Sequence, residues 1–111
     1  MGKAYEESTR RVRSWSKENL AAVKAEGERI TRDLGAAMDH GPEDARVQAL
    51  VGELHLHLRQ FYEPTPEAIA GLGRLYVEHP DFRARYEAVR PGLAAFLREA
   101  MAVYAASLRR R

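Results

Sequence analysis

The sequence predicts an all-α fold, and three observations carry this prediction. Apolar residues recur three and four positions apart along most of the chain, which is the period of one face of an α-helix. Proline and glycine interrupt this pattern at a few places, where helices start and stop. No segment reads as a strand once the longer helical patterns are weighed against short alternations. With 111 residues the chain has the length of one domain, and we expect about five helices.

The N-terminal stretch, residues 1–15, is highly charged, so we expect an arm or a frayed helix there. Ser16 then marks the start of the first firm helix, because its hydroxyl can accept a hydrogen bond from a free backbone N–H. We expect this helix over residues 16–39. Gly27 and Gly35 lie inside it at a cost of up to about 1 kcal/mol each, which suggests a closely crossing helix. Its inward face is predicted to hold Leu20, Val23, Gly27, Ile30, Leu34, Ala37 and Met38.

Gly41 ends this helix and Pro42 suits the first position of the next, which we expect over residues 42–62. Within it, residues 54–58 alternate leucine and histidine, which is the period of a strand. The proline start and the longer helical pattern outweigh these five positions. Leu56 lies off the main apolar face, as it would in a helix that lines a cleft as well as the core. The inward face is predicted to hold Val47, Leu50, Val51, Leu54, Leu58 and Phe61.

Three further helices follow, separated by prolines. Thr65 can cap the third helix and Pro66 can start it, and it should reach Glu78. A short helix then carries Phe82, Tyr86 and Val89, and Pro91 starts the last one. The proline breaks favour crossed helices of unequal length over a simple up-and-down bundle. The inward residues of the third and last helices are predicted to be Ile69, Leu72, Leu75, Tyr76, Leu93, Phe96, Leu97, Met101, Tyr104 and Leu108.

Composition excludes several classes of protein. The formal net charge is only +2 and the surplus basic residues gather near the two ends, so the basic patch of a nucleic-acid binder is missing. The chain has no cysteine, which excludes disulfides and thiolate chemistry and fits a reducing cytoplasm. Neither an apolar run long enough for a membrane span nor a signal peptide is present. We therefore expect a cytoplasmic protein without a membrane partner.

The sequence also argues against an enzyme and against a metal site. His55 and His57 are two positions apart, so on a helix they point about 200° apart and cannot bind one metal ion. The carboxylates are scattered over polar faces, and no serine stands in a nucleophile elbow. Gly71 and Gly73 lie within a helical pattern, unlike a phosphate-binding loop. We predict no catalytic residues, no metal and no cofactor.

The candidate ligand-binding residues are large amphipathic side chains near helix breaks. Aromatic residues at helical spacing usually belong to the core. Trp15, Phe61 and Tyr62 stand beside breaks, where diverging helices leave pockets that aromatic groups line. The full set predicted to bind a ligand is Trp15, Met38, Leu56, Phe61, Tyr62, Tyr76 and Tyr86.

Four short motifs together resemble a known family. They are the Phe-Tyr-Glu run at 61–63, Gly-Leu-Gly at 71–73, Tyr-Val at 76–77 and Arg-Pro-Gly-Leu-Ala-Ala at 90–95. At this spacing the chain resembles the antibiotic-recognition (TipAS) domain of MerR-type bacterial transcription regulators. The resemblance implies a globin-like helix arrangement without haem, with residues 16–111 as the effector-binding domain. It also implies a cleft that binds thiopeptides and other drug-like compounds, and an upstream segment that orders when ligand binds.

Two departures from this family have consequences. Members that capture thiopeptides covalently have a cysteine two residues after the Phe-Tyr pair, where this sequence has Pro64. The resemblance therefore implies reversible binding. In whole regulators the domain follows a DNA-binding helix-turn-helix and a dimerising coiled coil, neither of which this sequence contains, so direct DNA contact would need a further domain. The alternative is a helical protein-interaction domain without a small ligand, in which Leu56 and the N-terminal arm dock a partner or form a homodimer.

Overall fold

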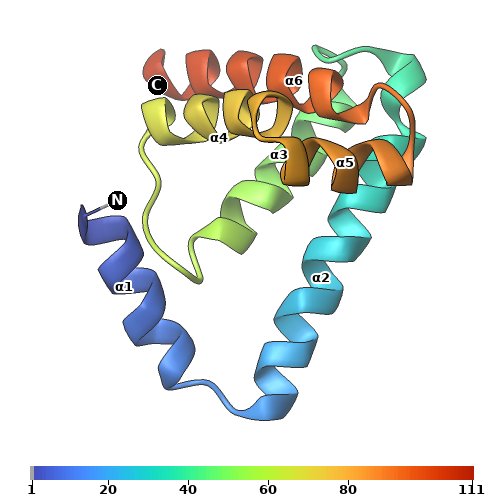
Figure 1. Cartoon of the computed structure of the whole chain (residues 1–111). Helices are drawn as coiled ribbons and strands as arrows, with labels where there is room; N and C mark the ends of the chain where they lie inside the picture. Colours follow the sequence, from blue (N-terminus) through green and yellow to red (C-terminus); the bar gives the residue numbers. More distant parts are fainter. Residues whose placement is uncertain (1) are drawn as a thin grey trace.

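The fold is built from helices alone over the part of the chain that the structure describes. The computed structural model describes residues 2–111, and over this range it shows six α-helices, one 3₁₀ turn and no strand (Figure 1). Met1, the first residue of the predicted arm, lies outside this range. The prediction of an all-α fold is confirmed. The elements are α1 (Gly2–Arg13), α2 (Lys17–Ala36), η1 (Met38–His40), α3 (Ala45–Leu58), α4 (Pro66–Glu78), α5 (Pro80–Val89) and α6 (Leu93–Arg109).

Two helix starts follow the predicted caps. The Ser16 hydroxyl accepts a hydrogen bond from the backbone N–H of Asn19 at 3.0 Å, and α2 begins at the next residue. The Thr65 hydroxyl accepts from the backbone N–H of Ala68 at 3.1 Å, directly before Pro66. Each cap satisfies a backbone donor that the helix itself leaves free, which is typically worth about 1 kcal/mol.

The predicted helix over residues 42–62 is too long at both ends. The carboxylate of Asp44 accepts from the N–H groups of Arg46 and Val47 at 2.9 and 3.3 Å, so α3 begins after this cap and not at Pro42. At the other end α3 stops at Leu58, and the Phe-Tyr pair lies in the turn that follows. The first predicted helix, 16–39, is likewise split into α2 and η1.

The last helix also starts later than predicted. Gly92 has a φ of 92°, a left-handed conformation that glycine adopts without strain. The Glu87 carboxylate accepts from the N–H groups of Gly92 at 2.9 Å and Ala94 at 3.1 Å. These two hydrogen bonds lower the pKa of Glu87 and fix the corner between α5 and α6. Pro91 therefore precedes α6, which begins at Leu93.

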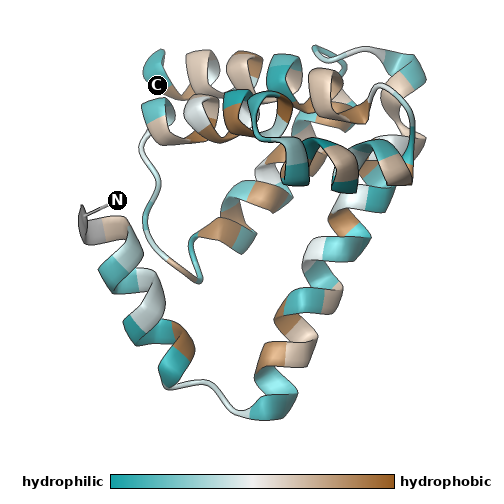
Figure 2. Cartoon of the chain, in the orientation of Figure 1, coloured by the Kyte–Doolittle hydropathy of each residue, from teal (hydrophilic) through white to brown (hydrophobic). Residues whose placement is uncertain are grey.

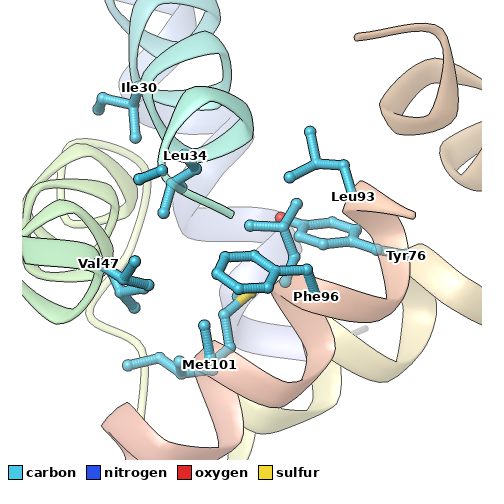
Figure 3. Close-up of a cluster of buried hydrophobic side chains, with 12 residues drawn as sticks. Ile30, Leu34, Val47, Tyr76, Leu93, Phe96 and Met101 are labelled. Carbon is cyan, nitrogen blue, oxygen red and sulfur yellow. The ribbon is translucent and has the colours of Figure 1, made fainter. Parts of the chain in front are cut away.

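The core forms where α6 crosses α2, α3 and α4. Figure 3 shows side chains from these four helices converging on one cluster, with Leu34 and Met101 almost completely buried. Burying a side chain of this size contributes roughly 1.5–3 kcal/mol. The labelled members of the cluster are Ile30, Leu34, Val47, Tyr76, Leu93, Phe96 and Met101.

The helix α1 and the N-terminal half of α2 diverge from the turn that joins them. In Figure 1, α1 and the lower half of α2 form the two arms of a V, while the upper half of α2 packs on the other helices. Leu20, predicted to face inward, is 45% exposed because no helix covers this part of α2. Figure 2 shows that hydrophobic residues nevertheless continue along it. The α1 arm is attached by Arg11, whose guanidinium donates to the Arg59 carbonyl at 2.7 Å.

No helix within residues 2–111 combines the length and the apolar character that crossing a membrane would require.

Candidate ligand-binding site

Two turns meet through their aromatic side chains. Trp15 lies in the turn between α1 and α2, and Phe61 lies in the turn between α3 and α4. The two rings pack edge to face, with centroids 5.3 Å apart and an interplanar angle of 64°. Both side chains, and that of Tyr62, are half-buried. The structure therefore brings together two of the three residues that the sequence placed beside helix breaks, Trp15 and Phe61.

His57 extends this cluster, although its residue type and spacing did not suggest a role in ligand binding. Its ring centroid is 5.7 Å from that of Phe61. The ring also lies against α2 at Gly27, where an added Cβ would be 3.0 Å from Nε2. The close crossing expected at Gly27 is thus confirmed. The signal in the sequence was a glycine inside a helix, but it did not reveal which side chain would fill the space.

His55 points to the other side of α3, as its spacing from His57 predicts. Its Nδ1 is 2.9 Å from the hydroxyl of Tyr104 on α6, while its Nε2 is buried without a hydrogen-bond partner. The nearest carboxylate oxygen, on Glu63, is 3.9 Å from Nε2. Burial lowers the pKa of His55; Glu63 opposes this effect, and Arg59 and Arg111 add to it. No group of three His, Asp or Glu side chains suited to a metal ion occurs within residues 2–111.

This arrangement predicts a stability that depends on pH through His55. Because the folded-state pKa lies below that of the unfolded chain, the unfolded chain takes up the proton first as pH falls. The free energy of unfolding should therefore be highest above the unfolded pKa of about 6.5 and should decrease as pH falls through the folded pKa. Urea unfolding of His55→Gln between pH 7.5 and 5 should show a smaller decrease than the wild type. His40→Gln, an exposed histidine, serves as the control, and equal pH dependence in wild type and His55→Gln would contradict the assignment.

A second aromatic cluster surrounds Tyr76. Its ring centroid is 4.6 Å from that of Tyr86 and 5.9 Å from that of Phe82, both on α5. Tyr76 is only 7% exposed, so its ring belongs to the core. Burial raises the pKa values of Tyr62, Tyr76 and Tyr86, and the neighbouring phenols of Tyr86 and Tyr62 raise that of Tyr76 further. The rings of Phe82 and Tyr86 thus pack α5 against Tyr76 on α4.

Two of the predicted residues, Met38 and Leu56, lie apart from these clusters. A 20-residue helix such as α2 spans about 30 Å, so Trp15 before it and Met38 after it are at opposite ends. Met38 packs on the core close to Gly92. It cannot share a compact site with Trp15. Leu56 is 61% exposed on α3, off the packed face as predicted.

Surface hollows occur between α2 and α3 and along α1. The first has a volume of about 400 Å³ and the second a volume of about 660 Å³. Neither is lined by any of the seven predicted ligand-binding residues. The linings are Asp33, Ala36, Ala37, His40, Arg46, Ala49, Leu50 and Glu53 for the first, and Tyr5, Glu6, Thr9, Arg10, Arg13 and Ser14 for the second.

Comparison with known proteins finds bacterial transcription regulators. The chain is 38% identical over 100 residues to the HTH-type transcriptional activator mta of Bacillus subtilis, covering 89% of this chain and 39% of that one. It is 39% identical over 111 residues to the regulator SkgA of Caulobacter vibrioides, with coverages of 90% and 44%. With the activator TipA of Streptomyces coelicolor it shares 33% identity over 101 residues, with coverages of 88% and 40%. The chain thus spans about two fifths of the length of these relatives.

A solved structure and a family model agree with these relatives. The structure of TipAS from Streptomyces lividans in complex with nosiheptide superposes with a TM-score of 0.87 at 26% identity, covering 97% of this chain and 78% of that one. The TipAS antibiotic-recognition domain model matches residues 1–104. Since that match extends over nearly the whole chain and the fold agrees with it, the chain belongs to the TipAS antibiotic-recognition domain family.

Proposed function

We propose that this domain reversibly binds bulky, partly apolar antibiotics or drug-like compounds, and that it senses them for a bacterial transcription regulator. The observation that carries this proposal is the edge-to-face contact of Trp15 with Phe61, in a member of an antibiotic-recognition family. This contact joins the two turns at the point of the V. A flat ligand between the arms would cover both rings and the exposed apolar part of α2.

The energetics favour such a ligand. Aromatic pairs contribute about 0.5–1.5 kcal/mol beyond the area they bury. Covering Leu20, which is 45% exposed, would remove further apolar surface from water. Pro64, buried in the turn after Tyr62, offers no nucleophile. We therefore propose binding without a covalent bond and without catalysis.

The relatives suggest the context in which the domain works. They are HTH-type regulators more than twice as long as this chain. We propose that a separate DNA-binding part acts with this domain in the bacterial cytoplasm, and that ligand binding here changes its action at promoters. The solved relative holds nosiheptide, a thiopeptide antibiotic, so thiopeptides are the first compounds to examine.

Titration of the chain with nosiheptide and a panel of flat aromatic drugs tests the proposal. Trp15 is the only tryptophan, so its fluorescence reports directly on the cluster. A bound ligand should change this fluorescence and stabilise the fold, by about 2.7 kcal/mol when its free concentration is 100 times Kd. Unchanged fluorescence and unchanged thermal unfolding across the whole panel would refute the proposal.

A protein-interaction domain is the second candidate. The observation that favours it is the exposure of large apolar side chains on three helices: Tyr5 at 65%, Leu20 at 45% and Leu56 at 61%. Sedimentation at increasing concentration would reveal a homodimer. A dimer that Leu56→Glu dissociates, in a chain that binds no drug, would favour this candidate over the first.

A further inference from the structure

The imidazole of His57 fills a space that Gly27 leaves on α2. A Cβ added at Gly27 would be 3.0 Å from Nε2 and 3.4 Å from Cε1 of this ring, closer than most contacts of a Cβ in proteins. Glycine lowers the stability of a helix interior relative to alanine. At this position a weaker helix is therefore combined with a close contact between α2 and the histidine on α3.

The same ring also contacts Phe61. The two ring centroids are 5.7 Å apart with an interplanar angle of 68°, which is an edge-to-face arrangement. Phe61 in turn packs edge to face on Trp15, with centroids 5.3 Å apart. Phe61 lies in the turn after α3 and is only half-buried, so few other groups fix its position. Gly27, His57, Phe61 and Trp15 thus form one continuous series of contacts that starts on α2.

A hydrogen bond holds the imidazole in its neutral form. The side-chain amide nitrogen of Gln60 is 3.2 Å from Nδ1 of His57 and also donates to the His57 carbonyl at 3.2 Å. A carbonyl oxygen only accepts, so the group that faces both atoms is the amide nitrogen, which only donates. Nδ1 is then the acceptor and the ring proton is on Nε2. A second proton, on Nδ1, would set two donors against each other and break this contact.

The charges around this ring offer little compensation for a second proton. On α2, Glu26 acts on His57, but it pairs with Arg29 at 2.8 Å. Arg29 also pairs with Glu53 of α3 at 2.5 Å. The ring of Phe61 carries no charge. Burial lowers the pKa of His57 and the charge of Glu26 opposes this effect. The folded chain therefore favours the neutral imidazole that the hydrogen bond from Gln60 requires.

From these contacts, and resting on the proposed function, we infer that His57 is a positioning residue of the ligand-binding site and acts in its neutral form. Its ring, supported on α2 at Gly27, holds Phe61 where Phe61 meets Trp15. A ligand that covers Trp15 and Phe61 buries the imidazole further, so a proton on the ring opposes binding. The affinity of the site is thereby linked to pH through a residue that need not touch the ligand.

Gly27→Ala tests this role without removing an aromatic side chain. The added Cβ makes the His57 ring move, while alanine favours the helix, so the variant should stay folded. It should bind nosiheptide roughly two- to fivefold more weakly, because the contact of His57 with Phe61 is displaced. Without ligand, the emission of Trp15 should shift to longer wavelength, since Phe61 then shields it less.

Two further variants show that the effect passes through the histidine. Gly52→Ala is the matched control on α3, where an added Cβ meets only Tyr104, at 3.8 Å, and it should leave the affinity for nosiheptide unchanged. His57→Ala should weaken binding by roughly two- to tenfold, the worth of one aromatic pair. In this background Gly27→Ala should have no additional effect, because the ring that the Cβ displaces is gone. An equal loss in both backgrounds would place the effect in the helix itself and refute the role of His57.

The pH profile of binding gives a readout that packing alone would not change. As pH falls below about 6.5, the free chain takes up the proton on His57 more readily than the complex does, so affinity should decrease. We expect affinity for nosiheptide to be roughly three- to tenfold lower at pH 5 than at pH 7.5, since one linked proton changes affinity by at most tenfold per pH unit. His57→Gln should lose most of this decrease, whereas His40→Gln should retain it. Any titration of the antibiotic itself is common to all three proteins.

The inference and the proposed function fail in different ways. If the wild type binds nosiheptide, but its affinity depends on pH as that of His57→Gln does, the inference fails and the proposed function stands. The same holds if Gly27→Ala and His57→Ala both bind as the wild type does. If the folded wild type binds neither nosiheptide nor any drug of the panel, both fail. Circular dichroism of each variant confirms that the helices are retained.

Discussion

Replacing Gly73 with alanine is expected to lower the free energy of unfolding by about 1–3 kcal/mol, the usual cost of overpacking. A Cβ at this position would lie 3.0 Å from the Arg98 Cα and 3.4 Å from the Arg98 carbonyl oxygen. Backbone atoms cannot move aside as the end of a flexible side chain can. The α4 and α6 helices would have to separate along the most extensive helix contact in the fold. Urea unfolding measures the effect.

Gly71→Ala is the matched control two residues away on the same helix. An added Cβ there meets only the guanidinium of Arg74, at 3.5 Å. Alanine is a better helix former than glycine by up to about 1 kcal/mol, so this variant should be as stable as the wild type or more stable. If Gly73→Ala proved equally stabilising, the close packing of α4 on α6 described here would be wrong.

Replacing Phe61 with alanine is expected to weaken nosiheptide binding by roughly 30-fold, or about 2 kcal/mol, the effect of removing a central aromatic contact. Phe61 contacts both Trp15 and His57, yet it lies in a turn and is only half-buried. The fold should therefore survive its loss. Fluorescence titration gives the affinity and circular dichroism gives the helix content.

Leu75→Ala is the control for this variant. It removes a large apolar side chain that is 37% exposed on α4 and takes no part in the aromatic contacts described above. It should leave the affinity for nosiheptide unchanged. Loss of binding together with loss of the fold in Phe61→Ala would make Phe61 a core residue, and the candidate site would then have to be placed elsewhere.

The sequence predicts most of the helices because their signals are local. Ser16 and Thr65 each cap the helix that immediately follows, and a cap needs only the next few residues. The start of α6 could not be predicted from a local cap. Its cap is the Glu87 carboxylate, five residues before Gly92 and on another helix, so Pro91 was the stronger local signal.

The candidate site was predictable only in part, for a related reason. Aromatic residues beside helix breaks identified Trp15, Phe61 and Tyr62, and the structure brings the first two into contact. Periodicity shows which face of a helix is apolar, but it does not show whether another helix covers that face. The exposure of Leu20 could therefore not be predicted from the sequence. The contact of His57 with Phe61 and with α2 at Gly27 depends on how α3 crosses α2, which no sequence spacing reveals.

A crystal structure of the chain soaked with nosiheptide is the most direct test. We expect the antibiotic between the arms of the V, with its rings against Trp15 and Phe61. Antibiotic bound instead in the hollow between α2 and α3, around Leu50 and Glu53, would contradict it.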